Sequence, residues 1–264
     1  MSESQDNLKV MGLMDHLGEL RTRIFRSLVI VLILFGAAFS ISDYIFNVIK
    51  EPLVKALPEG SNVLHFTGPM DVFIANIKLS LLVAVIGGCP VWLYQFWKFL
   101  EPALYDHEKK YALPFLVSSV GLFFGGVSFC FFIIMPLALE FLIGMGMEVG
   151  TPIITVGDYI SMLMILILGF GLVFETPVIL VLLALLDLID ADTLAENRKF
   201  VLVGILILGA LLTPPDPMSQ VAMGVPTYLM FELSIVIIRM IKRKKGSDDK
   251  DSDQKPGKQV ASKS

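Results

Sequence analysis

The sequence contains few charged residues and little cysteine or histidine. Only 17% of its 264 residues are Asp, Glu, Lys or Arg, whereas about a quarter of an ordinary soluble domain is charged. Hydrophobic residues make up 55% of the chain and the mean hydropathy is +0.74. This composition excludes an ordinary soluble domain. Long uncharged runs alternate with short charged clusters, which is typical of a polytopic membrane protein.

The same scarcity argues against a catalytic or metal centre. Cys89 and Cys130 lie in different apolar runs, where we interpret them as small buried hydrophobic residues. The three histidines, His16, His65 and His107, are expected on separate loops. No H-E-x-x-H, G-x-S-x-G or phosphate-binding glycine motif occurs in the sequence. We therefore expect a protein that is not an enzyme, with no metal and no cofactor, and the net charge of -4 gives no reason to expect nucleic acid as a partner.

Six apolar runs predict an all-α chain with six transmembrane helices. The runs are residues 27–42, 79–97, 111–139, 159–186, 200–212 and 220–238. Before them, residues 1–12 are expected to be flexible; the six-span domain is expected to occupy residues 13–245, and residues 246–264 to form a disordered tail. The fifth run rises only about 20 Å against a hydrocarbon thickness of about 30 Å. Either the 213–219 turn lies within the outer leaflet, or the bilayer thins there, or a short helix packs against longer neighbours.

Basic residues are distributed unequally between the two sets of connections. One set contains fourteen Lys and Arg residues, whereas the other contains three, which are Lys50, Lys55 and Lys78. The cytoplasmic side of a membrane protein carries the excess of basic residues. The sequence therefore predicts that both termini are cytoplasmic. Trp92, Trp97 and nearby tyrosines are expected to form an interfacial aromatic belt on that side.

Glu175 is the acid least expected from its surroundings, because it interrupts the fourth apolar run. A charged side chain at mid-bilayer costs about 2.5–3.5 kcal/mol on insertion scales. Pro177 lacks an N–H group and frees the carbonyl of residue 173, so a bend is expected there. Two interpretations remain open. Glu175 is protonated and bonded to a neighbouring helix, or it lines a hydrophilic pocket inside the membrane.

Two other acids, Glu19 and Glu108, lie near the predicted cytoplasmic side. Glu19 has Arg23 four residues later and is able to form an ordinary ion pair along a helix. Glu108 is able to be one charge on a solvated loop. From the residues alone, neither acid requires a special role.

Four separated segments carry a resemblance to a known family. The segments are "HLGELRTR", "FLEPALYDHEKK", "FGLVFETPV" and "LLTPPDPMSQ". Together they resemble TatC, the large integral component of the twin-arginine protein translocase, from about Met14 to Lys245. The resemblance implies six spans in a concave, cupped arrangement in a bacterial-type cytoplasmic membrane. It also implies transport of folded proteins driven by the proton gradient.

The resemblance further implies roles for particular residues. Glu19 and Glu108 correspond to the acids that receive the twin arginines of the signal peptide, with Arg21 and Phe99 in the same recognition face. Glu175 corresponds to the acid that lines the concave groove. Thr213, Asp216 and Gln220 correspond to the polar group that docks a partner's transmembrane helix, and Pro52 and Pro90 to structural support. The implied partners are twin-arginine signal peptides with their cargo, single-span TatA- and TatB-type proteins, further copies of the chain and membrane lipid.

Two rival functions are a solute transporter and an intramembrane protease. A proton-coupled small-solute transporter would use Glu175 as its proton carrier, but such proteins often contain internal repeats. No convincing repeat relates residues 20–140 to residues 156–240. An intramembrane protease would need a nucleophile–base pair, for which the sequence offers no candidate.

Overall fold

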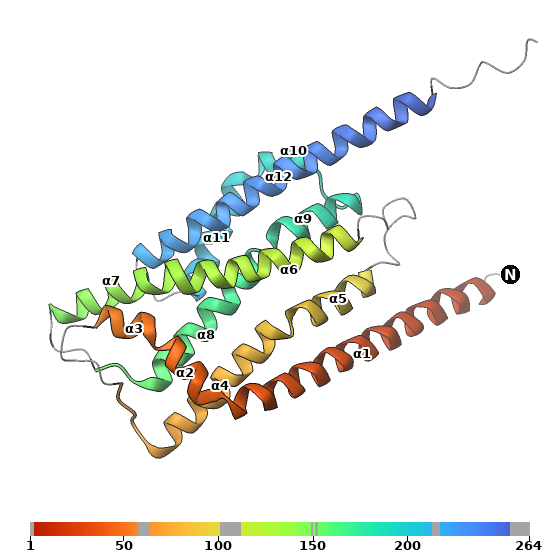
Figure 1. Ribbon diagram of the computed structural model, residues 1–264. Helices are drawn as coiled ribbons and strands as arrows, with labels where there is room; N and C mark the ends of the chain where they lie inside the picture. The colour runs from red at the N-terminus through yellow and green to blue at the C-terminus, as the bar shows by residue number, and fades with distance from the viewer. Residues whose placement is uncertain are drawn as a thin grey trace, which may run out of the picture.

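The computed structural model describes residues 3–57, 64–100, 112–148, 150, 153–212 and 217–253 (Figure 1). Within these ranges the chain is nearly all helical, and its β pairing is limited to an isolated bridge between His65 and Thr155. The helices are α1 (Glu3–Ser40), α2 (Ser42–Ile49), α3 (Glu51–Ala56), α4 (Pro69–Gly87), α5 (Cys89–Leu100), α6 (Ala112–Phe129), the π-helix η3 (Cys130–Ile134), α7 (Met135–Met147), α8 (Val156–Val173), α9 (Thr176–Leu185), α10 (Ala191–Glu196), α11 (Arg198–Leu212) and α12 (Pro217–Asp253). The all-α prediction is confirmed.

Five helical segments in the described ranges are long and apolar enough to cross a membrane. They are His16–Ser40, Pro69–Gly87, Leu113–Met147, Val156–Leu185 and Gln220–Ile241. The multi-pass character expected from composition is therefore confirmed. The predicted fifth span corresponds to α11, which has 15 residues and falls short of this length.

The second predicted span has different bounds in the structure, because α4 begins at Pro69 and includes Lys78. The prediction used uncharged runs, but one lysine does not end a helix. The helix ends instead at Gly87, with Gly88 as its C-cap, and α5 begins at Cys89 with Pro90 as its second residue. Proline is favoured in the first turn of a helix, since its missing N–H has no partner there in any case. The second apolar run is therefore two helices.

Both terminal helices extend beyond the predicted six-span segment. Helix α1 begins at Glu3. Helix α12 continues to Asp253, since no proline follows Pro226 before Pro256. The backbone is thus helical within part of the segments that we expected to be flexible or disordered. Residues 254–264 lie outside the described ranges.

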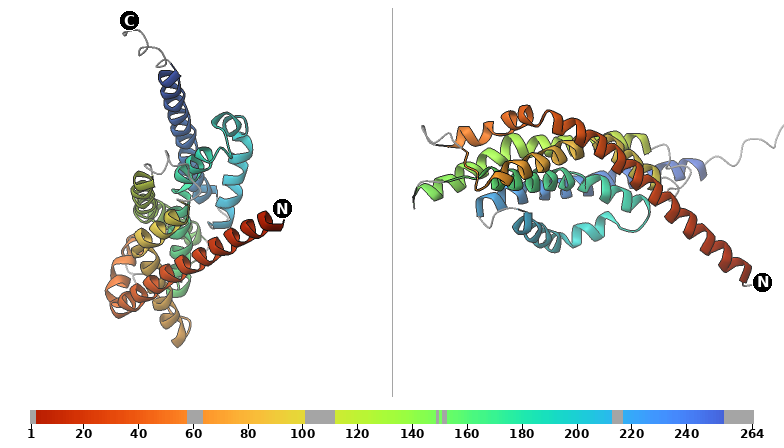
Figure 2. Two further views of the ribbon diagram at one scale, coloured as in Figure 1. Left: turned by 90° about the vertical axis from the view of Figure 1, so that its right-hand side faces the viewer. Right: turned by 90° about the horizontal axis from the view of Figure 1, so that it is seen from below.

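Helix α8 lies at the centre of the bundle. It packs against α4 on one side and α6 on the other, and α1 packs outside α4 and α5. Helix α12 packs against α9 and α11, so α1 and α11 lie on opposite sides of the molecule (Figure 2). The α8 side chains Tyr159, Ile160, Leu163 and Phe170 are almost fully buried. In lipid, such helices associate through close packing and hydrogen bonds rather than through burial from water.

Two glycines permit the close approach of α6 and α8. A Cβ atom added at Gly126 would lie 2.6 Å from the Phe170 carbonyl oxygen, and one added at Gly171 would lie 2.7 Å from the Phe123 ring. These separations are shorter than contacts between unbonded atoms. Small residues at such positions let helix backbones approach in membranes. The neighbouring Gly125 has no atom within 4 Å of its added Cβ.

We predict that Gly126→Ala destabilises the protein by about 1–3 kcal/mol, because the new methyl group must push α6 away from α8. Gly125→Ala is the matched control and should change stability by no more than about 0.5 kcal/mol. Thermal unfolding of the detergent-solubilised protein measures both variants. Equal melting temperatures for the two variants would show that this contact does not limit the packing of α6 on α8.

Candidate functional site

The helix break between α8 and α9 positions Glu175. Helix α8 ends at Val173 and α9 begins at Thr176, with Pro177 in its first turn. Pro177 has no N–H to donate to the Val173 carbonyl, and the Thr176 hydroxyl donates to that carbonyl instead at 2.6 Å. The Glu175 N–H donates to the Leu172 carbonyl at 3.1 Å. The expected bend is confirmed, and local hydrogen bonds replace the one that the proline removes.

The Glu175 side chain is buried, with 5% of its surface exposed. Its Oε1 atom has no hydrogen-bond partner among the described residues. The Ser119 hydroxyl of α6 interacts with the same carboxyl group, and Ser119 Oγ accepts a hydrogen bond from Trp97 Nε1 at 3.1 Å. A polar contact therefore runs from α5 through α6 to the α8–α9 break. One carboxyl oxygen remains available to a further donor.

The aromatic belt expected around Trp92 and Trp97 is only partly formed. Trp97 is 4% exposed and stacks on Phe115, with ring centroids 5.4 Å apart. Trp92 donates through Nε1 to the Val85 carbonyl at 3.0 Å. Both indole N–H groups therefore bond within the protein, and for Trp97 the interfacial interpretation is wrong. The alternation of aromatic residues in α5 gave no sign of which ring faces inward.

At one end of the bundle, Glu19 and Arg23 of α1 form an ion pair. Arg23 Nε donates to Glu19 Oε1 at 3.1 Å, and a second guanidinium nitrogen makes a shorter contact with the same oxygen. The Glu19 side chain is 40% exposed, whereas that of Arg23 is 15% exposed. The pairing expected from the spacing is confirmed. The carboxylate of this pair is accessible from solution, and the guanidinium is largely covered.

A histidine connects this ion pair to α5. His16 Nδ1 lies 3.9 Å from the other carboxylate oxygen of Glu19, Oε2. The His16 ring stacks on Phe99, with centroids 4.3 Å apart and an interplanar angle of 16°. His16 is helical rather than on a loop as expected, because α1 begins well before it. The structure thus brings Glu19 and Phe99, both predicted site residues, to the same place.

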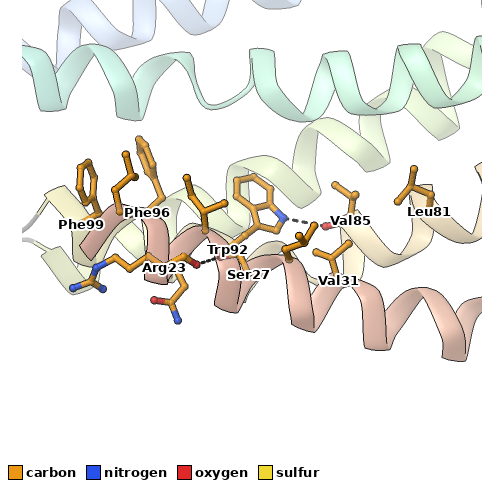
Figure 3. A pocket seen from close by; sticks show the side chains of 12 residues that line it. Arg23, Ser27, Val31, Leu81, Val85, Trp92, Phe96 and Phe99 are labelled. Atoms are coloured by element: carbon orange, nitrogen blue, oxygen red, sulfur yellow. Dashed lines mark hydrogen bonds between the residues drawn. The ribbon is translucent and has the colours of Figure 1, made fainter. Parts of the chain in front are cut away.

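An apolar groove begins beside this cluster. Its volume is about 530 Å³, and it lies between α1 and the consecutive helices α4 and α5. Figure 3 shows Arg23, Phe96 and Phe99 at one end and Leu81 and Val85 at the other. Its other lining residues are Leu20, Ile24, Ser27, Leu28, Val31, Trp92 and Gln95. Arg23 is the charged residue of this lining, at one end of the groove, and most of the other lining side chains are apolar.

A second, smaller groove lies between α11 and α12, with a volume of about 240 Å³. Leu206, Val221 and Gly224 are among its lining residues. Next to it, Gln220 donates through Nε2 to the Leu206 carbonyl at 3.1 Å. The predicted docking residue Gln220 therefore borders an apolar surface shared by the two helices.

The remaining predicted site residues are distributed as follows. Arg21 lies exposed on α1. Pro52 is in the first turn of α3, and Pro90 is an exposed residue in the first turn of α5. Glu108, Thr213 and Asp216 lie outside the described residues. Their contacts with the other site residues stay predictions.

Three residues of these sites were not singled out from the sequence as functional. The sequence indicates Arg23 only as an ordinary ion-pair partner of Glu19, and His16 only as one of three histidines far apart in the chain. Their spacing relative to Glu19, at i−3 and i+4, was the available signal. Ser119 carried no signal, because its role depends on the packing of α6 against α8.

The fold and these sites define a class of protein. Several apolar helices, a buried acid at a helix break and two lateral grooves describe a multi-pass membrane protein whose polar groups are arranged for binding. The sequence profile described as "Sec-independent protein translocase protein (TatC)" matches residues 15–226. The chain belongs to the TatC family, whose members are non-enzymatic components of a protein translocase.

Individual relatives agree with this assignment. The chain is 41% identical to the TatC protein of Aquifex aeolicus over 237 residues, covering 89% of this chain and 98% of that protein. It is 39% identical to the TatC protein of Escherichia coli K12 over 230 residues, covering 86% and 88% respectively. A crystal structure of the twin-arginine translocase receptor TatC superposes with a TM-score of 0.75 at 40% identity, covering 85% of this chain and 98% of that one. A second structure, crystallised in DDM, gives 0.76 at 42% identity, covering 84% and 98%.

We predict that Glu175→Leu raises the free energy of unfolding by about 1–3 kcal/mol, because it removes a buried oxygen that has no partner among the described residues. Glu175→Gln, which keeps a polar group in the same volume, is the control and should raise it less. Thermal unfolding in detergent measures both. A lower melting temperature for Glu175→Leu would mean that the contact with Ser119 already satisfies this carboxyl group.

Proposed function

We propose that this chain is the receptor of a twin-arginine translocase and binds the arginines of signal peptides through Glu19 and Glu108. One observation carries the proposal. The Glu19 carboxylate is 40% exposed at the end of the bundle and already accepts two contacts from a guanidinium, that of Arg23. The surroundings of Glu19 are therefore compatible with arginine as a ligand. The crystal structures that this chain resembles are of a protein called the twin-arginine translocase receptor.

The chemistry of the two acids explains why arginine is preferred to lysine. A guanidinium presents parallel N–H groups that fit a carboxylate, whereas a lysine ammonium is a compact point charge without this fork. Two carboxylates that each receive one guanidinium make the preference stronger. Phe99 adds an aromatic face beside Glu19, through its stack with His16. Arginine side chains stack on such faces more readily than lysine side chains do.

The proposal includes six spans with both termini in the cytoplasm of a bacterial-type cell, across its inner membrane. Helix α11 is the additional span, packed along α12 although its 15 residues rise only about 22 Å. The start of α1 and the end of α12 project from the same end of the bundle (Figure 1). The fourteen basic residues of the predicted cytoplasmic connections support this orientation.

Single-span partners of the TatA and TatB type are proposed to dock at α11 and α12. The apolar groove between these helices suits a transmembrane helix, and Gln220 beside it offers an amide to a polar residue of the partner. Thr213 and Asp216 belong to the same proposed surface. The short span of α11 would bring this amide nearer to the apolar interior.

The proposed role of Glu175 is to keep a polar position inside the membrane during transport driven by the proton gradient. Its Oε1, which has no hydrogen-bond partner in the described part of the chain, and its position at a helix break support this role. The proton-coupled solute transporter is not favoured, because the relatives are named as protein translocase components.

We predict that Glu19→Ala and Glu108→Ala each weaken the binding of a twin-arginine peptide more than tenfold, since a charge-assisted hydrogen bond contributes about 1.5–3 kcal/mol. Fluorescence anisotropy of a labelled peptide with the detergent-solubilised protein measures the affinity. Glu51→Ala is the control, because Glu51 also pairs with a basic residue four positions later, Lys55, but lies near the opposite end of the bundle. Unchanged binding in both site variants would remove these acids from the receptor site.

We also predict that Glu175→Gln retains part of the export activity, whereas Glu175→Leu loses more of it, because a polar position matters more there than a charge. Export of a folded reporter with a twin-arginine signal peptide, in cells that contain this chain as their TatC component, measures the difference. Full export by the Glu175→Leu variant would contradict the proposed role.

A further inference from the structure

The ion pair between Glu19 and Arg23 has a consequence for the proposed receptor site. The group that Glu19 holds in the unliganded chain is a guanidinium, which is the same group that a signal-peptide arginine presents. Both contacts fall on Oε1, whereas Oε2 faces His16 at 3.9 Å. A peptide arginine that takes both oxygens of Glu19 in a bidentate geometry must therefore compete with Arg23.

We propose that Arg23 is an internal occupant of the signal-peptide arginine site, and that an arginine of the ligand displaces it from Glu19. This inference rests on the proposed function and concerns the regulation of the same site. Arg23 then acts as an affinity residue, because it occupies the carboxylate that the peptide arginine must take.

The displacement is feasible because the internal pair is weak. Both partners lie on one helix four residues apart, and ion pairs at this spacing contribute little to the stability of a helix. The Glu19 carboxylate is 40% exposed, so an incoming guanidinium reaches it from solution. Exchange of one guanidinium for another leaves the carboxylate paired throughout. The displaced Arg23 side chain, which is 15% exposed, must turn outward to reach water, and its long stem permits this.

The position of Arg23 also defines what the ligand must contain. Arg23 lies at the charged end of the apolar groove, near Phe99 of α5 (Figure 3). Leu20 and Ile24 of α1 also line the groove. A ligand that replaces Arg23 at Glu19 places its following residues in this groove. The groove therefore fits a peptide in which an apolar segment follows the arginines, which is the order of basic and apolar regions in signal peptides.

An internal competitor has a defined thermodynamic signature. It lowers the apparent affinity of every ligand that uses Glu19 by the same factor, namely the fraction of molecules in which Glu19 is free. Removing it should therefore tighten binding of a twin-arginine peptide and of a twin-lysine peptide equally. The ratio between the two affinities should stay constant.

The test compares Arg23→Met with Arg26→Met in the full-length, detergent-solubilised protein. Arg26 is exposed on the same helix one turn later and does not line the groove, so its variant reports the general effect of removing one positive charge. The probes are two labelled peptides of identical apolar sequence, one with Arg-Arg and one with Lys-Lys. Arg23→Met should bind both about two- to fivefold more tightly. Arg26→Met should change either affinity less than twofold.

A second comparison places the same change in a Glu19→Gln background. There the internal pair is already lost, so Arg23→Met should have no further effect on either peptide. Arg23→Lys should show a smaller gain than Arg23→Met, since an ammonium still pairs with Glu19 but without the fork. Arg23→Gln provides an independent variant if Arg23→Met does not fold.

Three results would overturn the inference. Weaker binding by Arg23→Met and Arg23→Gln would mean that Arg23 orients Glu19 for the ligand. An equal gain from Arg26→Met, or a gain that persists in the Glu19→Gln background, would mean that only net charge matters. If Glu19→Ala itself leaves peptide binding unchanged, the proposed function fails instead, which separates the two failures.

Discussion

The structure depends on one constraint, which is that polar backbone groups inside a membrane must bond within the protein. The constraint is hardest to meet at the break between α8 and α9, where Pro177 removes a donor in the middle of the central helical segment. The Thr176 hydroxyl supplies the missing donor, and the neighbouring N–H groups turn back to α8. The Val173 carbonyl and the Glu175 N–H are therefore both satisfied within the break itself. It allows the chain to place a carboxyl group, Glu175, where a straight helix would place an apolar side chain.

The two acids that the structure describes most fully, Glu19 and Glu175, differ in the partners of their carboxyl groups. Glu175 is buried and has an oxygen without a partner in the described part of the chain, although Ser119 interacts with its carboxyl group. Glu19 is accessible and already paired with Arg23. Burial raises the free-energy cost of leaving a hydrogen bond to Glu175 unmade. Exposure of the Glu19 carboxylate lowers the cost of exchanging its partner. The same functional group thus suits a fixed polar position in one place and reversible binding in the other.

The sequence predicted the helical class, the apolar runs and the bend near Pro177, because these follow from composition and from the backbone chemistry of proline. It also predicted the Glu19–Arg23 pair, which depends only on helical spacing. It missed the start of α4 at Pro69, since Lys78 was read as a boundary although its ammonium donates to the Ser161 hydroxyl of α8 at 2.8 Å. It also misplaced Trp97, whose partner Ser119 lies on another helix. Features within one helix were therefore predictable, and features that depend on two packed helices were not.

A receptor of this kind binds its ligand without catalysing a reaction, and the small free energies expected of its contacts are consistent with that. An ion pair such as Glu19–Arg23 contributes much less free energy than the formation of a specific complex requires. One acid alone therefore does not select a signal peptide. Selectivity requires several modest contacts that a single ligand satisfies together, namely carboxylates at one end and an apolar groove beyond them. The fixed stack of His16 on Phe99 joins these two parts, because it holds α1 against the end of α5. A ligand that has only the cations, or only the apolar segment, makes only one of these two kinds of contact. In the proposed site, the spacing between the charged and the apolar part of the ligand therefore determines which ligands bind.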